Sequence, residues 1–384
     1  MMNDVPPSPI LASGVIMSNQ PIELPSWTEP DPDAARIAGL VENLAAKDGP
    51  ADAAGTWPEA LWRLIQDGGA TRWSLPRDFG GEACPRPLLL QRYAQLASGS
   101  LTAVFVLSQH DAAVRRLDGA VDRLAAREWL RAIAAGKAFA TVGVSQLTTS
   151  RRLGSQALVA TETERGTFQL DGAMPWVTAA ERADVLVTGA LLDDGRQMLI
   201  ALPVDRAGLT VRPAFELAAL QASCTTEVIL EHVRVSAADL LAGPSADLSA
   251  QPGAVGTAGL ETSALALGQA RAALGALAGL AADRFELSDP VDVLCETWQQ
   301  AWTLLMACAR GERDAVAASQ IRAQANALVL RATQTYLTAR KGSGFLRSEP
   351  AQRWARQALF FLVWSCPTPI AQAASRDLAG LCPA

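Results

Sequence analysis

The sequence predicts an α+β protein in which a β-sheet is inserted between two helical parts. Three observations support this class. Residues 31–138 have helical spacing, residues 139–241 have strand and hairpin patterns, and long Ala/Leu-rich helical segments begin at Thr257. At 384 residues, the chain is long enough to pack these layers around a large core.

Composition sets the expected boundaries. Residues 1–28 lack the spacing of a helix or strand and are interpreted as a flexible tail, followed by a helical domain over 29–138. Residues 139–243 form the middle β domain, and the Gly/Pro/Ser-rich stretch 244–256 is a linker. Residues 257–384 are helical again.

The first helical part shows apolar spacing and a clear loop. Leu89, Tyr93, Leu96 and Ala97 fall at i, i+4, i+7 and i+8, which is one face of a helix. The stretch WSLPRDFGG (73–81) holds a proline and two glycines, so it is expected to connect helices.

The middle part predicts antiparallel hairpins. ALVATET and TFQLDG flank Arg165-Gly166, and VLVTGALL and RQMLIALPV flank a turn that ends in Gly195. GLTVRP and TTEVILEHVRV add two strands. No GxGxxG or Walker-type loop is present, so neither a Rossmann nor a P-loop nucleotide site is indicated.

The last part predicts three long helices, over Glu261–Phe285, Val291–Arg310 and Arg313–Arg340, before the turn-rich KGSGFLRSEP. The first is apolar on most of its surface, so it must be buried in a bundle or an oligomer interface.

Charge and cysteine usage exclude several classes of function. The formal net charge is −6, which disfavours nucleic-acid and anionic-membrane partners. The six cysteines lack CxxC spacing and only two histidines are present, so no metal site is expected and the thiols are interpreted as reduced. No signal peptide or stretch of membrane-spanning length is evident, so a cytoplasmic protein is expected.

Several short motifs occur in an order that resembles the acyl-CoA dehydrogenase superfamily. These are PRDFGG in the first loop, Trp176-Val177-Thr178, SCTTEVILEHVRV from Ser223, and GQARAAL from Gly268. The resemblance covers nearly all of the chain after the tail. It implies an N-terminal helical domain, a middle β domain and a C-terminal four-helix bundle, in a homodimer, homotetramer or hetero-oligomer.

The same resemblance implies FAD as the cofactor. Trp176 and Thr178 match the family's W-I-T/S, which lies against the flavin, and Ser145 falls in a loop that can hydrogen-bond the flavin edge. Arg284 matches an arginine that reaches the pyrophosphate across a subunit boundary, although it would also suit a helix C-terminus. TARKGSGF resembles the family's Q-x-x-G-G-x-G-[FY], which implies that Thr338, Gly342 and Gly344 contact the cofactor. Two positions depart from this motif: Thr338 replaces the glutamine and Lys341 replaces the first glycine. The alternative is that this stretch is only a turn that connects two helices.

The resemblance places Ser365 where the family has its catalytic glutamate. In acyl-CoA dehydrogenases that glutamate abstracts the α-proton while the flavin takes the β-hydride. A serine hydroxyl without an adjacent histidine or lysine in the sequence cannot hold that proton near neutral pH. Classical α,β-dehydrogenation by this chain alone is therefore not expected.

Two other residues are candidates for acid–base chemistry. Some family members place the glutamate on the first C-terminal helix, near Ala258, and Glu261 lies about one turn away. The alternative is a solvated glutamate at a helix N-terminus. His110 lies on a helix that borders the family's active-site cavity, and its alternative is a surface or capping histidine bonded to Gln109 or Asp111.

Three functions stay open from the sequence. The first is an FAD-dependent oxidoreductase acting on an acyl-CoA or another small molecule, with an electron-transfer partner or oxygen as acceptor. Oxygenation by a flavin monooxygenase of this fold belongs here. The second is an acyl-CoA dehydrogenase with an unrecognised base. The third is a catalytically inactive subunit of a hetero-oligomeric complex.

Overall fold

The computed structural model describes residues 22–147, 158–246, 248, 259–364 and 366–381. Five helices come first: α1 Ala34–Ala54, α2 Glu59–Asp67, α3 Arg86–Gly99, α4 Leu101–Asp118 and α5 Leu124–Ala134. The strands follow: β1 Ala140–Gly143, β2 Val159–Glu164, β3 Thr167–Val177, β4 Val185–Leu192, β5 Gln197–Pro203, β6 Leu209–Val211, β7 Thr226–Ser236 and β8 Leu240–Ser245. The last helices are α6 Leu260–Ala281, α7 Ser288–Ala309, α8 Ala315–Arg340, α9 Pro350–Val363 and α10 Thr368–Leu378.

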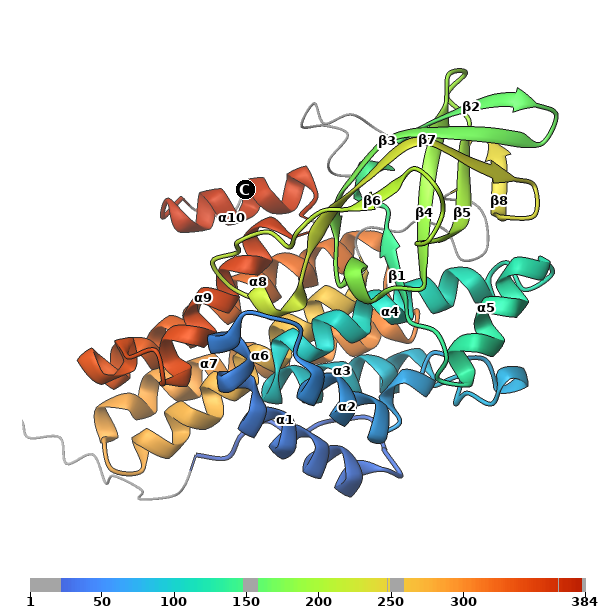
Figure 1. Ribbon diagram of the computed structural model, residues 1–384. Coiled ribbons are helices and arrows are strands. Elements are labelled where there is room, and N and C mark those ends of the chain that lie inside the picture. Colours follow the sequence, from blue (N-terminus) through green and yellow to red (C-terminus); the bar gives the residue numbers. More distant parts are fainter. Residues whose placement is uncertain (1–21, 148–157, 247, 249–258, 365, 382–384) are drawn as a thin grey trace, which may run out of the picture.

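The sheet lies to one side of the helices, as Figure 1 shows. Its strand order is β6-β7-β3-β2-β4-β5-β8, with β1 beside β4. Both predicted hairpins are present: β2 pairs with β3 around Gly166, and β4 pairs with β5 around Gly195. Both glycines have positive φ, which a side chain would disfavour. The sheet is mixed rather than wholly antiparallel, because β4 pairs in parallel with both β1 and β2.

The helical core is built around α6. This helix packs against α3, α7, α8 and α9, and α8 in turn packs against α7 and α9. These four C-terminal helices form the expected bundle, to which α10 is added. The approach of α6 to α3 requires a glycine at 268, since a Cβ there would lie 2.1 Å from the Ala94 carbonyl oxygen.

The N-terminal segment differs from the expected loose tail. Residues 1–21 lie outside the described residues, but Ile22, Leu24 and Trp27 pack against the helical core. The Trp27 ring contacts Trp298 and Trp302 edge-on, with centroids 5.4 and 5.0 Å away. An aromatic side chain held on two sides fixes its segment, so the described part of this stretch is docked.

A buried ion pair locks the first helical domain to the last. Asp48 on α1 accepts hydrogen bonds from Arg353 on α9 at 2.8 Å and from the Ser100 hydroxyl at 2.6 Å. Both charged side chains are under one-tenth exposed. Arg356, one turn along α9, pairs with Asp52 and also donates to the Ala218 carbonyl. The two helical domains therefore form one unit at this end.

Candidate functional site

The sheet positions one group of the candidate cofactor residues. Trp176 lies near the end of β3 with its ring 53% exposed and 5.0 Å from the Phe215 ring. Thr178 is the first residue after β3 and is buried. Ser145 begins a short 3-10 helix after β1 that packs against β3 and β4. The structure thus brings these three residues to the same end of the sheet.

A chain of buried hydroxyl groups fixes Thr178. The Ser223, Thr225 and Thr178 side chains are linked in series, with oxygen–oxygen distances of 2.9 and 3.1 Å. The Thr141 hydroxyl donates to the Thr178 carbonyl at 2.9 Å. Ser223 and Thr225 belong to the SCTT motif, so this motif and the W-V-T motif meet in space. The sequence did not indicate these contacts.

The second group lies where α6 and α8 end. Arg284 donates from Nη1 to the Ala339 carbonyl at 2.6 Å and from Nε to Glu286 at 2.9 Å. It therefore caps a helix C-terminus, although that helix is α8 rather than α6. Thr338 and Gly342 are exposed, and nothing lies within 4 Å of a Cβ built on Gly342. Gly344 is buried against Arg340, where a Cβ would come within 2.6 Å of the Arg340 Cβ.

Lys341 has the backbone of a glycine. Its φ is 53° and its ψ is −147°, a combination that residues with a Cβ rarely adopt. This is the position at which the resemblance expects the first glycine of the motif. The turn therefore has a backbone conformation that suits glycine, although a lysine occupies the position.

The two groups lie on different parts of the fold, the first on the sheet and the second at the far ends of α6 and α8 (Figure 1). Apolar side chains are exposed beside the second group: Phe285 at 68%, Phe345 at 79% and Leu346 at 57%. Exposed apolar side chains of this size favour contact with another surface.

Ser365 lies outside the described residues, but Trp364, the residue before it, is anchored. The Trp364 ring stacks on Phe360 at 4.8 Å. Arg322 on α8 donates from Nη2 to the Trp364 carbonyl at 2.8 Å and from Nε to Asn326. Arg322 is 3% exposed and makes no ion pair with any described residue, and burial lowers its pKa to about 10. A buried guanidinium without a carboxylate thus adjoins this position.

His110 is neither a surface nor a capping histidine. It is 2% exposed, stacks on Phe139 at 5.2 Å, and its Nδ1 lies 3.0 Å from the Ala140 carbonyl oxygen. Nδ1 therefore carries the proton, and the buried Nε2 has no hydrogen-bond partner among the described residues. Burial lowers the pKa of His110 to about 4, so the ring is neutral at neutral pH.

Glu261 is not a solvated glutamate. Its side chain is 13% exposed and pairs with Arg86 and Arg115, each at 3.3 Å. Burial alone would raise the pKa of Glu261, but Arg115 and Arg86 together hold it below its usual value. A carboxylate held ionised in this way is a weak base, which counts against Glu261 as a substitute for the missing glutamate.

Asp111 is a titratable residue that the sequence did not single out. It is fully buried on α4, accepts a hydrogen bond from the Tyr93 hydroxyl, and its Oδ1 has no partner among the described residues. Burial raises its pKa to about 6. Perturbed carboxyl groups of this kind are found both at active sites and in structural networks. Its position in the sequence beside His110 gave no sign that the two side chains face different elements.

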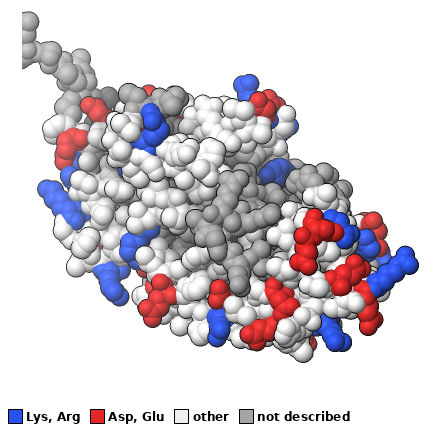
Figure 2. Space-filling model, turned by 90° about the horizontal axis from the view of Figure 1, so that it is seen from above, with Lys and Arg blue, Asp and Glu red and all other residues white. Residues whose placement is uncertain are grey.

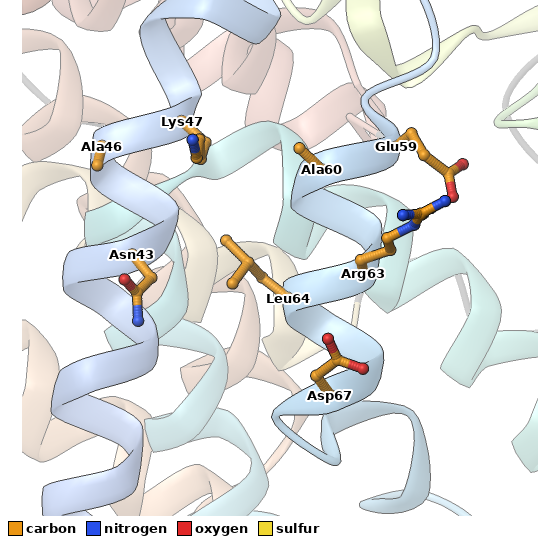
Figure 3. Close-up of a pocket in the computed structure, with 8 residues that line it drawn as sticks. All are labelled: Asn43, Ala46, Lys47, Glu59, Ala60, Arg63, Leu64 and Asp67. Carbon is orange, nitrogen blue, oxygen red and sulfur yellow. Dashed lines mark hydrogen bonds and ion pairs between the residues drawn. The ribbon is translucent and has the colours of Figure 1, made fainter.

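A pocket of about 470 Å³ opens between α1 and α2, lined by Asn43, Ala46, Lys47, Glu59, Ala60, Arg63, Leu64 and Asp67 (Figure 3). None of the sequence-predicted site residues lines it. The Arg63–Glu59 pair at its edge lies within α2 and is exposed on both sides. This groove is therefore separate from the candidate site.

The surface and the longest apolar helix bear on partners. On the face shown in Figure 2, basic and acidic side chains are interspersed without a broad basic area. Among the described residues, α6 is long and apolar enough to cross a membrane, contrary to expectation. This is weak support for a membrane segment, because α6 packs against four neighbouring helices.

Helices, a central sheet and a helical bundle in this order define the acyl-CoA dehydrogenase fold. No protein-family model matches the chain. Structural comparison gives a TM-score of 0.76 with butyryl-CoA dehydrogenase from Megasphaera elsdenii, at 17% identity over 92% of this chain and 99% of that chain. This comparison confirms the expected fold, which is that of the acyl-CoA dehydrogenases.

Other comparisons extend the range of relatives. A probable acyl-CoA dehydrogenase of Bacillus subtilis is 31% identical over 129 residues, which span 32% of this chain and only 34% of that protein. A dibenzothiophene monooxygenase from Paenibacillus has a TM-score of 0.71 at 19% identity, over 91% of this chain and 97% of that one. The same monooxygenase was solved with FMN and indole, and a glutaryl-CoA dehydrogenase of Mycobacterium smegmatis with FADH2. The fold thus hosts both dehydrogenases and monooxygenases.

Proposed function

We propose that this chain is a flavin-dependent oxidoreductase that does not perform classical α,β-dehydrogenation, because Ser365 stands in place of the base. The observation that carries the proposal is the arrangement at the end of β3. There the exposed Trp176 ring adjoins Thr178, whose hydroxyl is held by Thr225. An aromatic face beside a fixed hydroxyl suits a planar ring with polar edges.

FAD is the flavin we propose, with the ring at the sheet and the pyrophosphate at the ends of α6 and α8. The residues present fit such a group in part. Arg284 uses Nε and Nη1 internally, while its Nη2 has no acceptor among the described residues and suits a phosphate oxygen. The open space over Gly342 allows close approach to its backbone. When bound, the flavin would accept or donate the electrons of the reaction.

A homo-oligomer follows from the separation of the two groups. Because they lie on different parts of one chain, a second copy would have to bring its Arg284 and Gly342 to the Trp176 of the first. The exposed Phe285, Phe345 and Leu346 supply an apolar surface next to the pyrophosphate residues. The alternative is a hetero-oligomer in which this chain is the inactive subunit. Two departures from the family's motifs favour it: Ser365 in place of the glutamate and Lys341 in place of a glycine.

The substrate class is an acyl-CoA or another small molecule, and Ser365→Glu tests the reaction. Under anaerobic conditions, butyryl-CoA should leave the visible absorption of wild-type bound flavin unchanged and should bleach that of Ser365→Glu. Bleaching of the wild type at a comparable rate would refute the assignment of Ser365. Failure of both, with flavin and butyryl-CoA bound, would favour the inactive subunit. Oxygen consumption by the reduced wild type would favour the monooxygenase.

A further inference from the structure

Three arginine side chains gather at the N-terminus of α6, and we refer to Arg86, Arg115 and Arg116 as the arginine cluster. They come from α3 and α4; Arg86 and Arg115 contact the carboxylate of Glu261, and the charge of Arg116 also acts on it. Two of them pair with that one carboxylate at 3.3 Å. The only hydrogen bond of Arg116 in the described structure runs from Nη1 to the Ala112 carbonyl, within its own helix.

The positive charge of the cluster is not balanced. Three guanidinium groups lie near the ionised carboxylate of Glu261. Burial raises the pKa of the nearby Asp111 to about 6, so Asp111 is largely ionised at neutral pH and adds a second negative charge beside Arg115. The guanidinium groups still outnumber the carboxylates. Arg116 is 7% exposed, and burial, followed by the charge of Arg115, lowers its pKa to about 10. The N-terminus of α6, a helix of 22 residues, adds further positive potential.

Two buried donors in the cluster lack acceptors. Arg115 Nη1 and Arg116 Nε are both inaccessible and have no hydrogen-bond partner among the described residues. Arg115 Nη1 belongs to the same planar guanidinium group as Nη2, which pairs with Glu261. Each buried donor left unsatisfied costs roughly 1–3 kcal/mol, and more when it is charged. A ligand oxyanion would be a suitable acceptor for such a donor.

We propose that the arginine cluster is a binding site for an oxyanion of a small molecule, a carboxylate or a phosphate, and that Glu261 holds part of this site in the present structure. Forked guanidinium groups match the paired oxygens of either ligand. Arg86 and Arg115 are 45% and 33% exposed and form the open side of the site. The Glu261 carboxylate folds back over Gly259, so it competes with the ligand for the same donors.

The test is calorimetric titration of the purified protein, with whatever cofactor it carries, using succinate and, separately, inorganic phosphate at constant ionic strength. Glu261→Gln removes the competing charge and should bind the anion at least about tenfold more tightly than wild type. Arg115→Met and Arg116→Met should each weaken binding roughly tenfold or more, since hydrogen bonds to charged groups contribute about 1.5–3 kcal/mol. Arg63→Met, which removes an exposed pair on α2, is the matched control and should bind like wild type.

Saturable binding of either anion with this variant pattern supports the site, and the anion that binds identifies the ligand group. The absence of saturable binding in both wild type and Glu261→Gln would overturn it, as would binding that Arg115→Met and Arg116→Met leave unchanged. Urea unfolding of each variant confirms that it is folded. The titration does not depend on a flavin, so it is independent of the proposed function.

Discussion

Replacing His110 by asparagine should remove a large pH dependence of stability. In the folded chain the pKa of His110 is lowered from 6.5 to about 4 by burial. Each unit of difference between the folded and unfolded pKa corresponds to about 1.4 kcal/mol. The stabilisation from the neutral ring is complete above pH 6.5 and is lost as the pH falls toward 4, because the unfolded chain then binds the proton more readily. Wild type should lose about 2 kcal/mol by pH 5 and about 3 kcal/mol by pH 4.

The assay is urea unfolding followed by tryptophan fluorescence between pH 7.5 and 4. His110→Asn keeps a donor for the Ala140 carbonyl but does not titrate. The raised pKa of Asp111 has the opposite effect, because it makes the folded chain more stable as the pH falls over the same range. Asp111 is present in both proteins, so the difference in unfolding free energy between wild type and variant isolates the effect of His110. His232→Asn is the control, because that side chain is 80% exposed. Parallel profiles for wild type and His110→Asn would refute the buried, neutral assignment.

Two further substitutions test the structure. Lys341→Gly should stabilise the chain by roughly 1 kcal/mol, because it relieves a positive-φ strain of about 1–3 kcal/mol while the extra freedom of glycine in the unfolded chain costs about 0.5–1 kcal/mol. The control Lys137→Gly, at an ordinary φ, should destabilise the chain. A loss of stability in both variants, measured by thermal unfolding, would contradict the reasoning. Asp48→Asn leaves Arg353 buried without its partner and should cost roughly 3–5 kcal/mol in urea unfolding. Asp377→Asn breaks an exposed pair and should cost under about 1 kcal/mol, so equal losses would refute the distinction.

The sequence was informative wherever local chemistry decides the structure. The glycines at 166 and 195 marked both hairpins, because their positive φ suits tight turns. The apolar composition of α6 predicted its burial. The parallel pairing of β1 and β2 with β4 was not predicted, since strand direction depends on contacts between distant segments.

The candidate site was less predictable than the fold. The pairing of Glu261 with Arg86 joins residues 175 positions apart, and no local pattern signals it. The burial of His110 was missed because α4 is covered on most sides: its partly exposed stripe runs through Gln109, Ala112 and Arg115, and position 110 lies off it. The sequence shows a lysine at position 341, and only the backbone shows that this residue adopts a conformation typical of glycine.

The visible absorption spectrum of the purified protein, with the released cofactor identified by mass, tests the central claim most directly. The account predicts a flavin spectrum with about one FAD per chain, weakened when Trp176 or Arg284 is replaced. A colourless protein that also fails to take up added FAD would contradict it.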